Sequence, residues 1–259
     1  MSRYSLRKGD TIVGFFDSLF GGDSEEKFVK RHVKRITNKF GQKEIRHDSY
    51  LALAQRGTPE AALGLLQRFT INLPDTISDE KEKRQVITIL SAMGEDLVSE
   101  PLREYLRDPK QNEIAMGLIA LEEVEGTDAL CKEIIHLLET SDPGDAWTSD
   151  RKLQIINQLD NYDFPDAAPA LLPYLEDLDD DVVFRAIEVL DAIGSDSQLR
   201  DSFMKIAVDE DTSMRVRNRI LEIVLGRKWH LATERKALEP LLPHGWFFTK
   251  RDHLKRTSN

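Results

Sequence analysis

Apolar residues recur along most of this chain at steps of three and four, with charged or polar residues between them. Leu102, Tyr105 and Leu106 share one face of a helix in this way, and residues 134–138 repeat the pattern. No run alternates apolar and polar side chains, as a half-buried strand would. The pattern therefore predicts helices throughout the body of the chain and no sheet.

The predicted helices come in pairs. The first helix of each pair is expected at residues 46–55, 79–92, 112–123, 149–159, 181–192 and 213–225. The second helix is expected at residues 59–69, 96–107, 128–138, 167–175, 197–208 and 233–241. Two longer segments that contain proline, residues 70–78 and 141–148, are expected to be loops.

The turn inside each pair recurs at nearly even intervals of 31 to 37 residues. Its marker is a glycine or, once, an aspartate: Gly57, Gly94, Gly126, Asp163, Gly194 and Gly226. A period of about 20–50 residues is the signature of a stacked repeat array, in which each unit buries its apolar face against the next.

The two most similar turns are residues 89–96 and 189–196. Both read as two apolar residues, a spacer, alanine, an apolar residue, glycine, a polar residue and aspartate. We expect each glycine to end its helix in the left-handed conformation and each aspartate to cap the next helix. At the first turn, Thr58 is the expected N-cap, with Pro59 at the first helical position.

A helix pair with this pattern resembles the HEAT repeat family, in particular the short bacterial form also found in phycobilisome-lyase-like proteins. Residues 181–190, followed by Gly194-Ser195-Asp196, carry the best match. The resemblance covers about residues 45–226. It implies an all-α fold, an α-α superhelix (a HEAT-like solenoid) of about five to six helix pairs. It also implies that Arg185 pairs with an aspartate of a neighbouring repeat, a structural role.

The ends of the chain do not follow the repeat. We expect four regions: an N-terminal extension at 1–26 that is partly disordered, a capping helix at 27–44, the HEAT-like array at 45–226, and a C-terminal cap with a disordered basic tail at 227–259.

The N-terminal extension contains a short apolar stripe, formed by Phe15, Phe16, Leu19 and Phe20. We interpret it as a plug over the open face of the first repeat, with a weak membrane-surface anchor as the alternative. Residues before Val13 resemble translated upstream sequence, so we expect the natural start at Val13.

Composition and charge narrow the class of protein. The 259 residues are 40% hydrophobic and 32% charged, with a single cysteine and no run of about 18–20 apolar residues that could span a membrane. These features predict a cytoplasmic protein, and the resemblance to the short bacterial form of the HEAT repeat implies a bacterial one. The net charge of −10 is uneven: residues 1–50 carry +4, residues 51–226 carry −19 and residues 227–259 carry +5. An acidic body repels nucleic-acid phosphates, so we do not expect nucleic-acid binding. We also expect no stable membrane anchoring, because the apolar stripe of the N-terminal extension is too short for it.

Motifs for catalysis are lacking. There is no glycine-rich phosphate loop, and the six histidines are scattered rather than set at metal-ligand spacing. Cys131 lies beside Leu130 and Ile134, so we interpret it as a buried, inert thiol rather than a nucleophile. The sequence therefore predicts no catalytic residue, no metal site and no cofactor.

These observations favour a non-catalytic scaffold or adaptor that binds another protein on the concave face of the solenoid, lined by the second helices. The candidate partner-binding residues comprise side chains expected to point outward from second helices and two aromatic residues of the tail: Arg68, Arg103, Arg107, His136, Tyr174, Arg200, Trp246 and Phe247. Two alternatives stay open, a nucleic-acid-associated protein that uses its basic termini and a bilin-lyase-like chromophore-handling protein.

Overall fold

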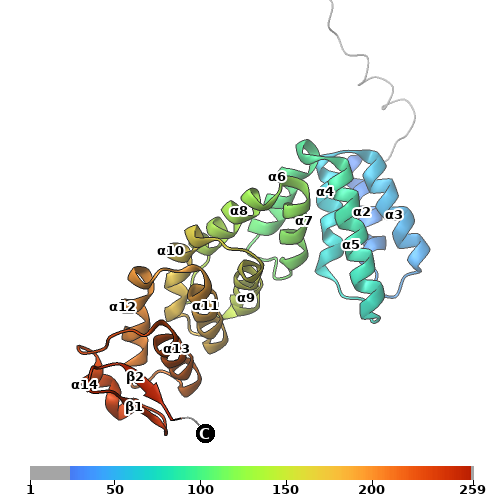
Figure 1. Cartoon of the computed structure of the whole chain (residues 1–259). Coiled ribbons are helices and arrows are strands. Elements are labelled where there is room, and N and C mark those ends of the chain that lie inside the picture. The colour runs from blue at the N-terminus through green and yellow to red at the C-terminus, as the bar shows by residue number, and fades with distance from the viewer. Residues whose placement is uncertain (1–23, 258–259) are drawn as a thin grey trace, which may run out of the picture. The chain divides into compact units, whose positions relative to one another are not determined.

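The computed structural model describes residues 24–257, which are mostly helical (Figure 1). The all-α class predicted from the sequence is confirmed. The chain forms two compact units that divide between Met93 and Gly94. None of the described helices is long and apolar enough to cross a membrane. The predictions about Val13 and about the stripe of Phe15, Phe16, Leu19 and Phe20 lie outside the described residues.

Between residues 24 and 93, the first unit contains four α-helices and one short 3-10 helix. These are α2 (Glu25–Ile36), α3 (Lys43–Arg56), α4 (Pro59–Leu66), η1 (Gln67–Thr70) and α5 (Thr76–Met93). Helices α2, α3 and α4 contact one another, and α5 packs on α3 and α4. Their shared core includes the fully buried side chains of Tyr50, Leu53, Leu65 and Leu90.

The second unit contains the other helices and the strands of the described chain. Its α-helices are α6 (Glu95–Arg107), α7 (Ala115–Glu125), α8 (Thr127–Thr140), α9 (Ser149–Gln158), α10 (Ala168–Leu171), α11 (Asp180–Ile193), α12 (Asp196–Ala207), α13 (Met214–Arg227) and α14 (Arg235–Leu238). Its 3-10 helices are η2 (Ala146–Thr148), η3 (Leu159–Asn161), η4 (Pro165–Ala167), η5 (Leu172–Glu176) and η6 (Glu239–Leu241). Two strands, β1 (Trp246–Phe248) and β2 (Leu254–Arg256), follow.

Within the second unit the helices form two layers. Helices α7, α9, α11 and α13 contact one another in series. Helices α6, α8, α10 and α12 lie along the other side (Figure 1). The first layer holds the predicted first helices of the pairs and the other layer holds the predicted second helices. Apolar side chains fill the space between them, among them Leu118, Ile134, Ile156, Ile187 and Leu221.

Every predicted helix has a helical counterpart in the structure. The least regular is the second helix expected at 167–175, which is the succession η4–α10–η5. Prolines at positions 165, 169 and 173 recur every fourth residue in this segment. Proline lacks a backbone N–H and crowds the preceding turn, so this segment cannot form a continuous α-helix.

The glycines at the first three turns have positive φ angles. Gly57 ends α3 in the left-handed conformation, with φ 63° and ψ 37°. Gly94 and Gly126 both have φ 89°. These conformations carry little cost for glycine and are strained for residues that bear a Cβ.

Gly194 does not adopt the expected left-handed conformation, since its φ is −92° and its ψ is 147°. Its role is close packing instead. A Cβ at this position would lie 2.7 Å from Leu199 Cδ2 and 2.9 Å from the carbonyl oxygen of Leu190. The turns at Gly94 and Gly194, nearly identical in sequence, therefore need glycine for different reasons.

Gly226 was expected at a turn but lies inside α13, which continues to Arg227. The left-handed residue that ends this helix is Lys228, with φ 56°. The helix extends past the glycine because Ile223 and Val224 on its last turns are buried, and packing outweighs the low helix propensity of one glycine.

The predicted caps are confirmed in one case and wrong in two. Thr58 caps α4, because its hydroxyl accepts a 3.2 Å hydrogen bond from the backbone N–H of Ala61. Asp96 and Asp196 lie in the first turn of their helices and are not caps. Ser195 is the N-cap of α12 and forms a capping box with the residue three positions on.

The C-terminal segment corrects the predictions of no sheet and of a disordered tail. Strands β1 and β2 pair antiparallel, with Phe247 opposite Lys255, and an isolated bridge joins His230 to His253. The strands are three residues long, too short for a period of two to stand out in the sequence. They are ordered by packing, since Phe248 and Leu254 are buried and β2 contacts α13.

Candidate binding surfaces

The predicted binding residues do not form one surface. Arg103, Arg107 and His136 lie together, whereas Arg68 and Tyr174 are fully buried. Both buried residues fall in 3-10 segments, η1 and η5. Each residue of a 3-10 helix turns by more than in an α-helix, so the face assigned from the α-helical period was wrong.

Arg68 belongs to a buried polar network in the first unit. Its guanidinium donates to Asp79 Oδ1 at 2.7 Å, to the Tyr50 hydroxyl at 3.1 Å and to the Ile71 carbonyl at 3.0 Å. It also lies 3.6 Å from the Glu82 carboxylate. An arginine with these partners stabilises the unit and is not available to a ligand.

The two carboxylates of this network are held in their charged form. Burial alone would raise the pKa of Asp79, but hydrogen bonds from Lys83 and Arg68 lower it below its ordinary value. Burial also acts to raise the pKa of Glu82, and bonds from Arg46 and Tyr50 again outweigh it. Arg46 binds Glu82 through two hydrogen bonds of 2.7 and 2.9 Å. A buried network whose members are all partnered fixes one arrangement of α3, η1 and α5.

Tyr174 has a comparable structural role in the second unit. Its hydroxyl donates to the Leu138 carbonyl at 2.8 Å, and burial raises its pKa to about 12. Nearby in the sequence, the Asp177 carboxylate accepts a 2.6 Å bond from Lys152 Nζ, and neither side chain is exposed. The start of the acidic turn at 177–181 is therefore part of a buried ion pair.

Arg185, for which the resemblance to HEAT repeats implies a pair with an aspartate of a neighbouring repeat, has an aspartate partner. It forms an ion pair with Asp160 at the end of the preceding first helix and donates a 2.6 Å bond to Asn157. These contacts join α11 to the α9–η3 segment.

The other second-helix candidates line a polar depression between α6 and α8, which we call the arginine pocket. It has a volume of about 510 Å³ and is lined by Glu95, Arg103, Arg107, Glu125, Asp128, Ala129, Lys132, Glu133 and His136. The first and last of these residues in the sequence, Glu95 and His136, are 41 positions apart. The packing of α6, α7 and α8 brings them to one pocket.

The arginines of this pocket are positioned by two largely buried carboxylates. Glu133 accepts bonds of 2.7 and 2.6 Å from Arg107 and lies 3.7 Å from Arg103. Glu125 accepts bonds of 2.8 and 2.5 Å from Arg103. These hydrogen bonds are the main reason that the pKa of each arginine is raised above its ordinary value.

The acidic and basic partners of these ion pairs differ in solvent exposure. The Glu133 side chain is 3% exposed and that of Arg107 is 43% exposed. The carboxylate is thus buried and part of the arginine side chain faces solvent, and the exposed Lys132 lines the same pocket. This arrangement offers fixed hydrogen-bond donors to an acceptor-bearing ligand, such as a carboxylate or a peptide carbonyl.

Glu133 and Lys132 were not among the binding residues predicted from the sequence. The sequence position of Glu133 could have indicated its role, because it lies three residues after Leu130 on the apolar face of its helix. An acidic residue at such a position requires a buried cation or hydrogen-bond donors. Lys132 had no signal beyond its charge.

Arg200 and the tail aromatics lie at the C-terminal end of the same unit. Arg200 donates to the His230 carbonyl at 3.0 Å and to Glu234 at 2.8 Å, so it attaches the tail to α12. Trp246 is half-buried, with the Arg256 guanidinium carbon 5.4 Å from its ring centroid. Phe247 is 47% exposed and is the tail aromatic most available to a partner.

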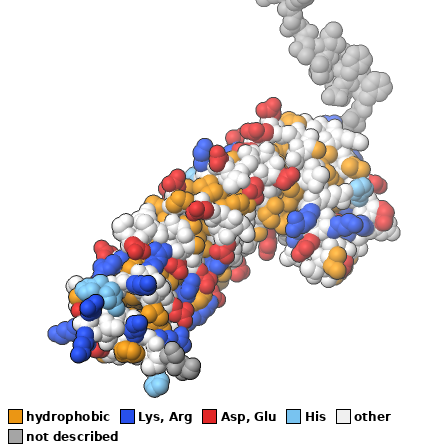
Figure 2. Space-filling view, viewed as in Figure 1, with side chains coloured by type: hydrophobic (Ala, Val, Ile, Leu, Met, Phe, Trp, Pro, Cys, Tyr) orange, Lys and Arg blue, Asp and Glu red, His pale blue; other side chains and the backbone are white. Residues whose placement is uncertain are grey.

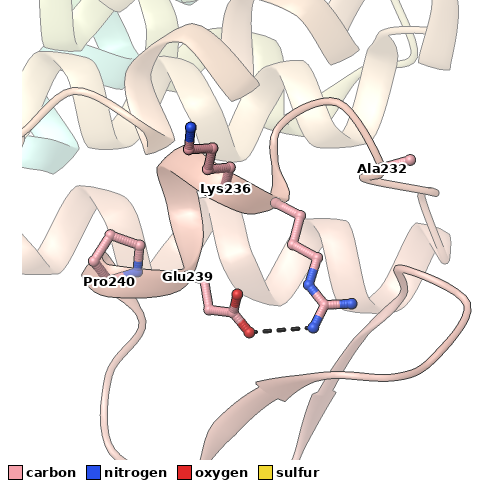
Figure 3. A pocket seen from close by; sticks show the side chains of 5 residues that line it. Ala232, Lys236, Glu239 and Pro240 are labelled. Atoms are coloured by element: carbon pink, nitrogen blue, oxygen red, sulfur yellow. Dashed lines mark hydrogen bonds and ion pairs between the residues drawn. The ribbon is translucent and has the colours of Figure 1, made fainter.

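Two further pockets lie in this C-terminal region. One, of about 540 Å³, is lined by Ala232, Arg235, Lys236, Glu239 and Pro240. Arg235 forms an ion pair with Glu239, with 3.3 Å between Nη2 and Oε1. Figure 3 shows Lys236 pointing away from Glu239.

The second C-terminal pocket, which we call the basic pocket, has a volume of about 490 Å³ between the end of α13 and the hairpin. It is lined by Leu225, Lys228, Thr249, Lys250, Arg251, His253, Leu254 and Lys255. No carboxylate is among these residues. Figure 2 shows Lys, Arg and His side chains gathered over this end of the unit.

Metal and thiol chemistry have little support in the described part of the chain. No group of three or more His, Cys, Asp or Glu side chains among residues 24–257 is arranged to hold a metal ion. Cys131 is half-buried rather than fully buried, and burial followed by the charges of Asp166 and Asp128 raises its pKa. A raised pKa leaves less of the reactive thiolate at neutral pH.

Comparisons with known proteins assign no relative. No protein-family model matches the chain, and no curated protein matches it in sequence.

Proposed function

We propose that the protein is a non-catalytic adaptor that binds a segment of another protein in the arginine pocket. The observation that carries this proposal is the placement of Glu133. One buried carboxylate holds Arg107 by two hydrogen bonds and approaches Arg103, while 43% of the Arg107 side chain faces solvent.

Positioned arginines suit protein recognition for a physical reason. A flexible side chain loses about 0.5–1.5 kcal/mol of conformational freedom when a partner immobilises it. Arg103 and Arg107 are already immobilised by their carboxylates, so much of this loss is incurred on folding. Arginine is also among the residues that contribute most to the binding energy of protein interfaces.

The charge of the pocket favours a polypeptide over a nucleic acid. Four acidic side chains, Glu95, Glu125, Asp128 and Glu133, line it together with three cations, Arg103, Arg107 and Lys132. A phosphate backbone would meet both signs, whereas a peptide can place an acidic side chain on the arginines and donors on the carboxylates.

The wider architecture we propose is a HEAT-like α-α superhelix of about five to six pairs, with the second helices as the binding face. The two layers of the second unit and the Arg185–Asp160 ion pair support this proposal. Arrays of this kind typically bind partners on an extended concave surface.

Site-specific crosslinking in cells tests the adaptor function. A photoreactive amino acid would replace Lys132 in the pocket or, as the control, Glu123, an exposed residue of α7 in the other layer. We expect one protein partner to crosslink at position 132 but not at 123, and Arg107→Ala to reduce its yield.

Equal crosslinking at both positions, or a yield insensitive to Arg107→Ala, would refute an adaptor function of this pocket. A captured species that disappears after nuclease treatment would instead support the nucleic-acid alternative.

A further inference from the structure

The basic pocket carries a concentration of positive charge that the fold does not use. Lys228, Lys250, Arg251 and Lys255 all line it, and among residues 24–257 none of the four has a carboxylate partner. Two arginines of the same region, by contrast, are paired. Arg227 binds Asp191 at 2.9 Å and Asp196 at 2.6 Å, and Arg235 binds Asp252 at 2.9 Å.

The one acidic residue of the hairpin turn is directed elsewhere. Asp252 lies between Arg251 and His253 in the sequence, yet its carboxylate pairs with Arg235 and does not line the pocket. The turn is held by Thr249, whose hydroxyl accepts from the backbone N–H groups of Arg251 and His253 at 3.3 and 3.1 Å. The cations are thus presented by an ordered loop.

The end of helix α13 forms the other side of the pocket, and the residue that caps it has a left-handed backbone conformation. Lys228 ends the helix with φ 56°, a conformation that costs a side-chain-bearing residue about 1 kcal/mol relative to glycine. A lysine at this position adds a fourth cation to the pocket.

The floor of the pocket is apolar. Leu254 is 3% exposed and Leu225 is half-buried, and both line it. Cations around an apolar floor fit a ligand that has an apolar body and an anionic group. Four cations exceed what one carboxylate requires, whereas a phosphate monoester carries a charge of about −1.5 to −2 at neutral pH.

The surrounding charge limits the length of that ligand. Residues 94–226 of the same unit carry 31 acidic and 12 basic side chains. A long polyanion that left the pocket would meet this acidic surface and be repelled. A volume of about 490 Å³ also lies in the usual range for small-molecule sites, about 300–1,000 Å³.

We propose that the basic pocket binds a small phosphate ester with an apolar or aromatic body. Its phosphate contacts Lys228, Lys250, Arg251 and Lys255, and its body packs on Leu225 and Leu254. This site is separate from the arginine pocket, and the inference does not depend on the adaptor function.

The test uses the full chain and measures affinity by calorimetry with 1-naphthyl phosphate as the probe. Inorganic phosphate and 1-naphthol, the two halves of the probe, are the comparison ligands. We expect the intact probe to bind about tenfold or more tightly than either half, since both the cations and the apolar floor contribute. Equal binding of 1-naphthol would overturn the proposal, because the phosphate would then have no role.

Two pocket variants and one control variant test the assigned cations. The double variant K250Q/R251Q should weaken probe binding by about tenfold or more, and Lys228→Gly by a smaller factor, because each removes charge–phosphate bonds. Glycine is chosen at 228 because it suits the left-handed backbone. Lys236→Gln removes an equally unpaired lysine outside the pocket and should leave affinity within about twofold. A loss in Lys236→Gln equal to that in the pocket variants would show diffuse attraction and overturn the proposal.

The source of the phosphate is distinguished by three further ligands. Adenosine monophosphate represents a nucleotide, a phosphoserine tripeptide represents a modified protein, and a ten-residue oligothymidylate represents nucleic acid. Tighter binding of either small ester than of the oligonucleotide supports the proposal. Tightest binding of the oligonucleotide, with the same dependence on Lys250 and Arg251, would replace it with a nucleic-acid site.

Discussion

Arg68 and Asp79 form a buried ion pair in which Nη2 lies 2.7 Å from Oδ1, and the two side chains are 0% and 8% exposed. The pair connects η1 to α5 within the first unit. Asp79 also accepts a 2.9 Å bond from the Leu73 backbone N–H, so the loop between these elements is fixed by the same carboxylate.

Replacing Arg68 should therefore destabilise the first unit strongly. We expect Arg68→Met to lower its unfolding free energy by about 3–5 kcal/mol, because Asp79 and Glu82 would remain buried with too few cations. Arg56→Gln is the control: its pair with Glu25 is 42% and 29% exposed and should contribute about 1 kcal/mol or less.

Local hydrogen exchange across residues 43–93 is the suitable measurement. The three tryptophans, Trp147, Trp229 and Trp246, all lie in the second unit, so their fluorescence does not report on the first. Similar losses of protection in the two variants would mean that the network contributes no more than a surface pair.

The same network predicts a pH dependence of stability. The pKa values of Asp79 and Glu82 are lower in the folded unit than their ordinary values of 3.8 and 4.5, so the unfolded chain binds more protons in acid. Their contribution is fully present at neutral pH and is lost as pH falls from about 5 through the folded-state values. Urea unfolding followed by exchange at pH 7, 5, 4 and 3 measures it. Asp79→Asn should show a smaller decline over this range, and an equal decline would contradict the assignment.

The helix pairs could be predicted from the sequence because each depends on local information. Apolar residues at steps of three and four identified every first and second helix, and Thr58-Pro59 identified a start. Whether a single side chain is exposed or buried was harder to predict from the sequence. Arg68 and Tyr174 lie in 3-10 segments, where the α-helical period misplaces side chains.

The candidate binding surfaces were predicted in part. Arg103, Arg107 and His136 were selected from their helix faces, and the structure brings them into one pocket. The buried carboxylates that hold the arginines come from α7 and α8, and their pairing depends on tertiary packing. The basic pocket was missed because residues 250–256 were expected to be disordered, and no local pattern indicates a strand of three residues.

Gly194 and Gly226 occupy matched positions in the repeat, yet substitution by alanine should have opposite effects. Gly194→Ala places a Cβ 2.7 Å from Leu199 and should destabilise the second unit by about 1–3 kcal/mol through overpacking. Gly226 lies inside α13 with open space around it, so Gly226→Ala should stabilise by about 0.5–1 kcal/mol. Thermal unfolding followed by tryptophan fluorescence gives both signs. Two changes of the same sign would show that the turns are equivalent after all.

The positioning of Arg107 by Glu133 in the arginine pocket can be tested without a partner. Glu133→Gln keeps the shape of the side chain but removes the charge that binds Arg107, and should cost about 1.5–3 kcal/mol of stability. In the native protein the Nε–H of Arg107 donates to Glu133 at 2.7 Å, so its NMR signal should exchange slowly with water. The signal should broaden or disappear in Glu133→Gln. Glu125→Gln is the matched control, because Glu125 binds Arg103 alone, and the Arg107 signal should then persist. Loss of the Arg107 signal in both variants would mean that the pocket loosens as a whole and that Glu133 does not position this arginine specifically.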